Sequence, residues 1–218
     1  MSIRKFAVHL SAAVLLVTLV LASRASHAGT PWIPPTSDPL AEELHKLGHD
    51  KKTHFVEPVT KKTWGRAQIF VDAPMKDVRA AVLDYGSWSS TIGRFEKSKV
   101  LKREANGATE VFLRMPILKG AATIWAVERF EPPVAEGTGE KVVGKLVKGN
   151  VDDLQTVWHY RPIDATHSIL TLEIFVLPKM VVPEALMISQ LEDAGGEGCL
   201  GLRDRAQLTA KTVALKKP

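Results

Sequence analysis

Residues 70–88 read FVDAPMKDVRAAVLDYGSW, and this stretch indicates how the fold begins. An extended run from Trp64 to Val71 ends at Ala73-Pro74, where proline removes a backbone hydrogen-bond donor. A short helical run, Lys76 to Leu83, follows with apolar side chains recurring on one face. Residues 84–88 then form a turn. The stretch therefore predicts a strand that leads into short helical structure.

Six runs of alternating apolar and polar residues come next, separated by turn-forming residues, and each is typical of a strand. They are Lys97 to Arg103, Thr109 to Ile117, Ala121 to Phe130, Lys141 to Lys148, Leu154 to Arg161 and Ser168 to Leu177. Asn106-Gly107, between the first two, is a strong hairpin signal. Pro183 to Leu215 has helical spacing of apolar and small residues. An antiparallel sheet with one apolar face needs a cover, so the sequence predicts an α+β domain in which this long helix covers the sheet.

The first 28 residues have the composition of a signal peptide. Arg4 and Lys5 precede an apolar core, Ala12 to Ala22, and a small-residue site at Ser26-His27-Ala28. We expect cleavage there and a periplasmic or secreted protein. The alternative, a retained membrane anchor, has an apolar core well short of the roughly 20 residues that span a bilayer.

Residues 29–62 are expected to be a Pro-rich spacer and a lead-in, with a short helix within Ala41 to Phe55, and the domain is expected to occupy 63–218. The histidines of the lead-in lie among charged residues, and we interpret them as solvated rather than as metal ligands.

Composition excludes several protein classes. Of 218 residues, 45% are hydrophobic and a single one is Cys, which excludes a disordered chain and a disulfide-stapled scaffold. Lys and Arg number 29 and Asp and Glu 24, and the leader would remove three basic residues and no acid. The remainder is nearly neutral, so we expect no nucleic-acid partner. No dinucleotide-binding, Walker or metal motif is present, and we expect no cofactor.

Three phrases of this sequence resemble the START-like superfamily, also called SRPBCC or helix-grip. The first phrase holds Ala73, Pro74 and Val78, the second Asp84, Tyr85 and Trp88, and the third Leu202, Arg203 and Arg205. The resemblance covers roughly Thr63 to Val213. It implies a helix-grip fold: a curved antiparallel sheet of about seven strands wrapped around the long C-terminal helix, with two short helices after the first strand. It also implies an apolar ligand between sheet and helix, and the superfamily contains lipid-transfer, coenzyme Q-binding and polyketide cyclase groups.

Strand parity indicates which side chains face such a space. Those that share the inward face are almost all apolar, whereas Arg114, His159 and Glu173 point outward; the parity of Glu128 and Arg129 stays open. The predicted ligand-binding residues are Trp88, Ile92, Met115, Trp125, Trp158, Tyr160, Leu172, Gly198 and Leu202. Trp88 and Ile92 are expected at the mouth and the others deeper.

The final helix carries an unusual concentration of glycine, with Gly195, Gly196, Gly198 and Gly201 within seven positions. Each costs a helix about 1 kcal/mol relative to Ala, so the group needs an offsetting reason. We predict that the small residues leave a void for a ligand. The alternative is a helix break at Gly195-Gly196.

Three functions remain open on this sequence. The first is binding, with or without transport, of a hydrophobic small molecule such as a lipid, quinone or polyketide, without chemical change. The second is a polyketide cyclase-type enzyme, for which Tyr160 is the inward titratable group, and the third is a cavity-free protein-interaction domain. Cys199 is interpreted as a core residue. Transient membrane-surface contact would follow if the lysines gathered around the mouth of the cavity.

Overall fold

The computed structural model describes residues 32–33, 37–117 and 120–215, and the elements below belong to the unit that begins at Ile33. The predicted signal peptide and the first residues of the spacer lie outside the described residues. The helical elements are α1 (Pro39–Leu47), α2 (Met75–Leu83), the 3-10 turn η1 (Tyr85–Ser87), α3 (Trp88–Thr91) and α4 (Glu184–Leu215). The strands are β1 (Lys51–Val56), β2 (Thr63–Val71), β3 (Lys97–Arg103), β4 (Thr109–Ile117), β5 (Ala122–Phe130), β6 (Val134–Glu136), β7 (Gly139–Gly149), β8 (Val151–Pro162) and β9 (Ser168–Pro178).

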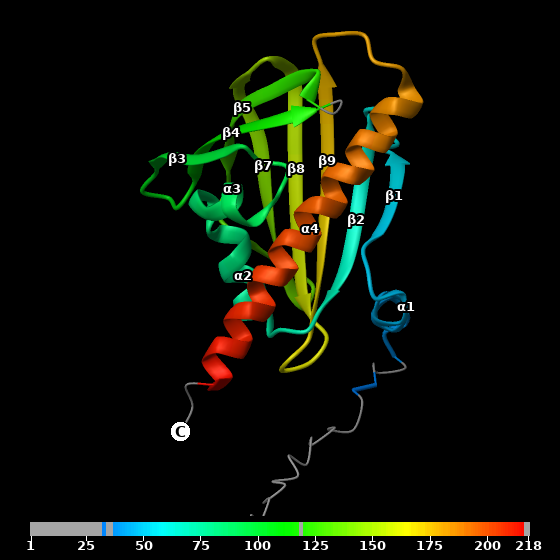
Figure 1. The fold of residues 1–218 in the computed structure, drawn as a ribbon, viewed down its shortest axis with the longest axis vertical. Helices are drawn as coiled ribbons and strands as arrows, with labels where there is room; N and C mark the ends of the chain where they lie inside the picture. The colour runs from blue at the N-terminus through cyan, green and yellow to red at the C-terminus, as the bar shows by residue number, and fades with distance from the viewer. Residues whose placement is uncertain (1–31, 34–36, 118–119, 216–218) are drawn as a thin grey trace, which may run out of the picture. The chain divides into compact units, whose positions relative to one another are not determined.

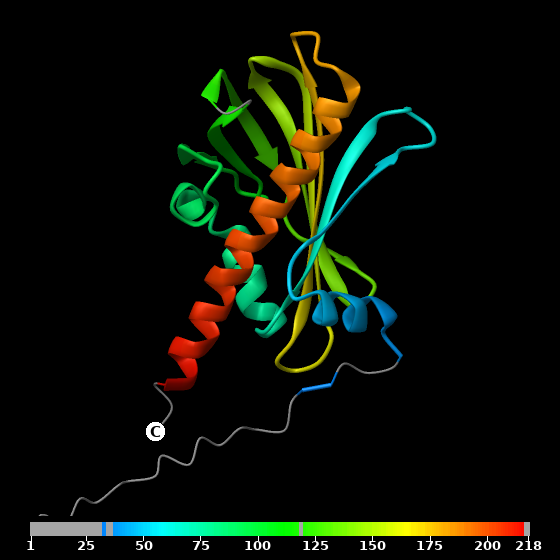
Figure 2. The same cartoon turned by 45° about the vertical axis from the view of Figure 1, so that its right-hand side comes forward.

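One antiparallel sheet holds all nine strands. Eight of them run in the order β1-β2-β9-β8-β7-β5-β4-β3, and β6 pairs with β7. The curved sheet has α4 crossing one of its faces diagonally, as Figures 1 and 2 show. The fold is therefore the predicted helix-grip, with the seven predicted strands within a few residues of their expected bounds and the hairpin turn at Gly107 with φ 91°.

The structure corrects the expected domain boundary at Thr63. The lead-in is not a single short helix, because Lys51–Val56 forms β1 and pairs along β2. Two side chains of β1 reach α4: Lys52 Nζ lies 3.0 Å from Asp193, and His54 Nδ1 lies 2.8 Å from Glu192. The sheet thus starts twelve residues earlier than the sequence indicated, and polar side chains hide the alternation in this edge strand.

Parity along the inner strands is as predicted. Residues of β4, β7, β8 and β9 that alternate inward form the apolar core with α2, α3 and α4. The opposite face of the sheet is covered in part by α1, whose Ala41 and Leu44 pack with Ile169. The short helices α2 and α3 lie between the sheet and the C-terminal half of α4, so they close one end of the space under the long helix (Figure 1).

The glycines of α4 do not leave the predicted void for a ligand. A Cβ on Gly198 would lie 2.9 Å from Leu172 Cδ2 and 3.1 Å from Trp158 Cη2, and one on Gly195 would lie 3.1 Å from the Ala67 Cβ. The glycines therefore bring the helix backbone close to the sheet. The alternative of a helix break is also wrong, because α4 is continuous from Glu184 to Leu215. Close approach of backbone to side chain offsets the propensity cost of glycine.

Within the described part of the chain, no helix has the length and apolar character needed to cross a bilayer.

Candidate functional site

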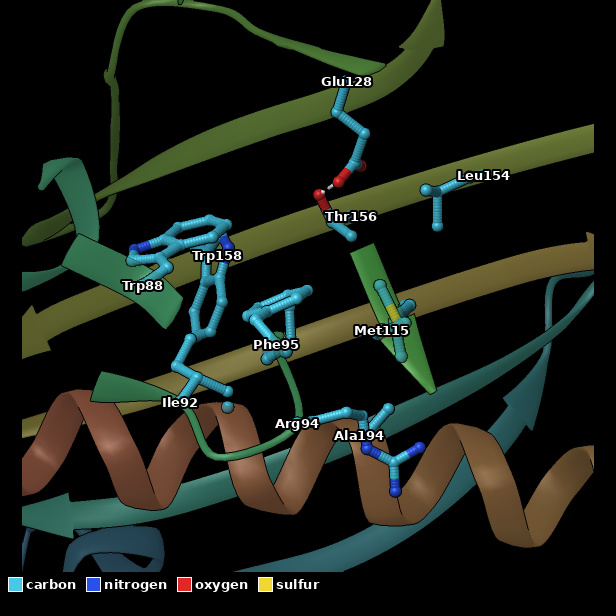
Figure 3. Close-up of a pocket in the computed structure, with 13 residues that line it drawn as sticks. Trp88, Ile92, Arg94, Phe95, Met115, Glu128, Leu154, Thr156, Trp158 and Ala194 are labelled. Carbon is cyan, nitrogen blue, oxygen red and sulfur yellow. Dashed lines mark hydrogen bonds between the residues drawn. The ribbon is translucent and has the colours of Figure 1, made fainter. Parts of the chain in front are cut away.

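Two small adjoining hollows lie between α4 and the sheet. One has a volume of about 30 Å³ and the other about 50 Å³, and both are bordered by Arg94, Met115, Ile174 and Ala194. The first lies beside α3 and the second beneath the N-terminal half of α4. Most of the lining of the first is apolar, namely Trp88, Ile92, Phe95, Met115, Leu154, Trp158, Leu172, Ile174, Ala194 and Gly198 (Figure 3).

The space is almost filled by the protein's own side chains. A hollow of this kind needs about 10–15 Å³ to hold one water, whereas small-molecule pockets usually measure about 300–1,000 Å³. The Phe95 ring occupies the middle of the site and stacks on Trp88 with ring centroids 5.9 Å apart. The Trp88 ring in turn lies 5.6 Å from that of Trp158. A drug-sized molecule therefore fits only after side chains or backbone move outward.

One short segment, residues 92–96, carries the side chain that fills the space. It connects α3 to β3 and carries both Arg94 and Phe95. The Arg94 guanidinium makes a two-point ion pair with Glu197 of α4, with Nη2–Oε1 at 3.0 Å and Nε–Oε2 at 3.2 Å. At the other end the Glu96 N–H donates to the Arg114 carbonyl at 2.9 Å. The ion pair holds the segment against the long helix at the edge of both hollows.

Glu128 is the acidic group of this cavity. It lies on β5 with 1% of its surface exposed, and its Oε1 accepts a hydrogen bond from the Thr156 hydroxyl at 3.0 Å. Burial raises the pKa of Glu128 to about 7, and the hydrogen bond from Thr156 offsets part of that rise. Among the described residues no cation forms an ion pair with it. Glu128 is therefore a carboxyl that is mostly protonated below pH 7 and about half protonated at pH 7.

The sequence contained a signal for Glu128 that we left open. In β5 the buried residues Ile124, Ala126 and Phe130 share its parity, so alternation alone places Glu128 inward and Arg129 outward. Arg129 does point outward, where it pairs with Glu104 and Glu131.

Two further polar groups of the wall are unpaired. The indole N–H groups of Trp88 and Trp158 are buried, and neither has an acceptor among the described residues. Each ring is 2% exposed, so bulk water does not reach the nitrogens. Buried donors without acceptors are uncommon in folded proteins.

The structure brings six of the nine predicted site residues together. These are Trp88, Ile92, Met115, Trp158, Leu172 and Gly198. Trp88 and Ile92 are buried, at 2% and 1% exposure, and so do not lie at a mouth. The edge of the site is formed by Arg94.

The other three residues lie elsewhere. Trp125 is on the outer face, 37% exposed and stacked on Phe112, because its parity is opposite to that of Ile124. Leu202 is buried in the core that α4 makes with the short helices and does not line either hollow. The Tyr160 hydroxyl donates to Glu140 at 2.7 Å, away from this cavity, so it is not the polar group of the site.

Cys199 and His159 lie apart from the cavity as well. The Cys199 thiol is fully buried and donates to the Ala67 carbonyl at 3.5 Å, and burial raises its pKa well above the usual range. His159 is on the outer face between Glu136 and Glu173. Burial lowers the His159 pKa, but the attraction of the Glu173 and Glu136 carboxylates outweighs it and leaves the pKa raised. Neither residue reaches the other, so no thiol–imidazole pair exists here.

Solved structures with a similar fold were found. A STAR-related lipid transfer protein from Xanthomonas axonopodis is 15% identical with a TM-score of 0.62, and the match covers 72% of this chain and 93% of that one. The human StAR-related lipid transfer protein 5 is 8% identical with a TM-score of 0.59, covering 78% and 96%. A START superfamily protein from Mycobacterium smegmatis is 14% identical with a TM-score of 0.55, covering 69% and 98%. At such identities the likeness shows a shared fold.

No curated protein matches this chain in sequence. A family model does: residues 71–194 match the family described as polyketide cyclase / dehydrase and lipid transport. The match runs from the last residue of β2 into the N-terminal half of α4, and it includes Glu128 and every residue that lines the two hollows except Gly198. Since it covers more than half of the chain, the protein belongs to this START-like polyketide cyclase / dehydrase and lipid transport family, as the three phrases of its sequence predicted.

Proposed function

We propose that this protein binds a hydrophobic small molecule between α4 and the sheet and carries it without changing it chemically. The observation that carries the proposal is the pair of adjoining hollows there, whose lining is almost wholly apolar. Family and fold support hydrophobic ligand binding, lipid transfer or cyclase-type function in general. Among these, binding fits best because the described lining of the cavity holds one carboxyl group and no set of convergent catalytic groups.

The ligand enters when the 92–96 segment moves away from α4. This motion breaks the Arg94–Glu197 ion pair and withdraws the Phe95 ring, which merges the two hollows into one space. The ion pair is partly exposed and therefore contributes little free energy, so little free energy is needed to break it. The apolar surface that Phe95 leaves is then covered by the ligand.

A neutral fluorescent dye, N-phenyl-1-naphthylamine, tests the proposal. We expect the dye to bind the wild type with increased emission, and Phe95→Ala to bind it about tenfold more tightly because the ring no longer competes for the space. Phe112→Ala is the matched control, since Phe112 lies on the outer face against Trp125. Absence of dye binding to the wild type and to Phe95→Ala alike would overturn the proposal and favour a protein-interaction domain.

We also propose transient contact with an anionic membrane surface through the loop between β9 and α4. In this loop Val181 is fully exposed and Met180 half-exposed. Lys61 and Lys62 border the same open groove of about 490 Å³, and Val182 borders both this groove and the second hollow. Exposed apolar residues beside lysines suit the interface of an anionic bilayer, and here they adjoin the ligand space.

Cosedimentation with liposomes tests the contact. Vesicles with 30% anionic lipid should retain the wild type at low salt and release it at high salt, and Val181→Asp should reduce the bound fraction several-fold. Leu208→Asp is the control, because Leu208 is an exposed apolar residue on the C-terminal half of α4. Equal retention of the two variants would remove this proposal and leave ligand binding untouched.

Export to the periplasm or the medium is likewise proposed, on the strength of residues 1–28 alone. The exported protein should begin at Gly29 by mass spectrometry of the intact chain. Recovery of the full-length chain from the cytoplasm would contradict export.

A cyclase-type enzyme is the second candidate, because Glu128 is a buried titratable group facing the cavity. A carboxyl with a pKa of about 7 suits general acid–base chemistry at neutral pH. Turnover of an added polyketide-like substrate by the wild type, lost in Glu128→Gln, would favour this candidate over the carrier.

A further inference from the structure

The polar groups inside the cavity are few, and their arrangement restricts what can bind. Of the side chains that line the first hollow, Arg94 is engaged by Glu197 at its edge. The remaining polar groups of the lining residues are the Glu128 carboxyl, the Thr156 hydroxyl and the two buried indole N–H groups. Figure 3 shows the Glu128 carboxyl beside Thr156 on one side of the cavity and Arg94 with α4 on the other.

Hydrogen bonding leaves a donor at Glu128. Because Oε1 accepts from the Thr156 hydroxyl, the proton of the neutral carboxyl resides on Oε2, which has no partner among the described residues. The burial of Glu128, at 1% exposure, and the lack of a cation beside it favour this neutral form. A neutral carboxyl in this position offers an O–H group to whatever occupies the cavity.

The unpaired indoles point to the same chemistry. Trp88 and Trp158, two lining residues, each carry a buried N–H that has no acceptor among the described residues. A hydrocarbon would leave these donors unpaired, and an amine would add further donors. A carboxylate would bring a charge next to Glu128, away from Arg94. An uncharged ligand with an oxygen acceptor can accept a hydrogen bond from the donors of the cavity wall.

We infer that the ligand is a neutral hydrophobic molecule with a carbonyl oxygen, as in a ketone, quinone or ester, and that Glu128 donates a hydrogen bond to that oxygen. This rests on the proposed function, since it specifies the ligand of the same cavity. It makes Glu128 and its partner Thr156 the residues that set specificity, while the apolar lining sets affinity.

Three compounds with one bicyclic carbon skeleton test the inference: tetralin, 1-tetralone and 1-aminotetralin. Each is titrated at pH 6 against the protein saturated with N-phenyl-1-naphthylamine, and the displacement midpoint is read. The wild type should release the dye at about tenfold lower concentration of tetralone than of tetralin, the factor expected from one neutral hydrogen bond. The amine should bind no better than tetralin.

Variants of Glu128 localise the effect. Glu128→Gln keeps an N–H donor and should retain the preference for tetralone within about threefold, whereas Glu128→Leu should abolish it. Glu110→Gln is the matched control on the outer side of the neighbouring strand β4 and should behave as the wild type. If Glu128→Leu does not fold, the selectivity of the wild type and of Glu128→Gln still decides the matter.

The outcomes separate this inference from the proposed function. Equal displacement by tetralone and tetralin would overturn the carbonyl ligand and leave hydrophobic binding in place, with Glu128 holding only water. Preference for the amine would show an ionised Glu128 and would also overturn it. Failure of the dye to bind at all would overturn the proposed function itself.

Discussion

Replacing the buried acid of the cavity with its neutral isostere should change how stability depends on pH. The pKa of Glu128 is about 7 in the folded protein, against 4.5 for an ordinary glutamate. Above pH 4.5 the unfolded chain releases this proton while the folded protein keeps it, so the folded state loses stability as pH rises. Each pH unit in that interval costs about 1.4 kcal/mol, and the wild type should lose about 3 kcal/mol by pH 7 from this group alone.

Glu128→Gln does not titrate and should escape this loss. Unfolding free energies from urea titrations at pH 4.5, 5.5, 6.5 and 7.5, followed by fluorescence of the buried tryptophans, give the difference between variant and wild type. That difference should move by about 3 kcal/mol in favour of the variant as pH rises, reaching a plateau only above pH 7.

The groups next to Glu128 do not produce the same pH dependence of stability. Tyr85, which faces Glu128 from η1, has a pKa that burial raises above its usual value, so it stays neutral throughout the interval. Thr156 does not titrate. Glu110→Gln serves as control and should follow the wild type. If the Glu128→Gln difference stays constant within about 1 kcal/mol from pH 4.5 to 7.5, Glu128 is ionised in the folded protein and the reasoning is refuted.

Three further predictions concern α4 and the outer face. Gly198→Ala should lower the unfolding free energy by about 1–3 kcal/mol in urea titrations, because its Cβ would lie 3.1 Å from the Trp158 ring, whereas Gly86→Ala meets no atom within 4 Å and should cost less than 1 kcal/mol. His159→Gln should destabilise the protein at pH 5 more than at pH 8; the raised pKa means that the pairing with two carboxylates stabilises below about pH 6.5 and is lost as pH rises further, and equal losses at both pH values would contradict it. Cys199 should react with a thiol reagent only in the unfolded protein, and rapid labelling in native buffer would show that α4 opens.

The sequence predicted those parts of the fold in which the apolar residues follow one clear pattern. In β8 the buried residues alternate from Leu154 to Tyr160, and β9 is a long, mostly apolar run, so the sequence pattern located both strands to within three residues. The pattern did not locate the strand β1, because four of its six residues are polar and none is fully buried. The exposed three-residue strand β6 carries no pattern that a sequence could reveal.

The site was accessible only in part, for reasons of geometry. Parity placed Met115, Trp158 and Leu172 correctly, whereas Trp125 belongs to the strand whose parity the sequence left open, and it faces outward. The glycine-rich stretch of α4 indicated an unusual contact with the sheet, but it did not indicate which kind. A small residue suits a void and a close approach of two backbones equally well. Phe95 escaped notice because it lies in an irregular segment, where no periodicity indicates which way a side chain points.

The close approach of α4 also determines which wall of the chamber can be remodelled. At Gly198 the surface under a bound molecule is peptide backbone, which has no rotamers to adjust and no side chain to shorten. The opposite wall, around Phe95, consists of flexible side chains on a tethered segment. Changing the size of the ligand that this protein accepts would therefore require substitutions at Phe95 and Met115, while the long helix stays unchanged.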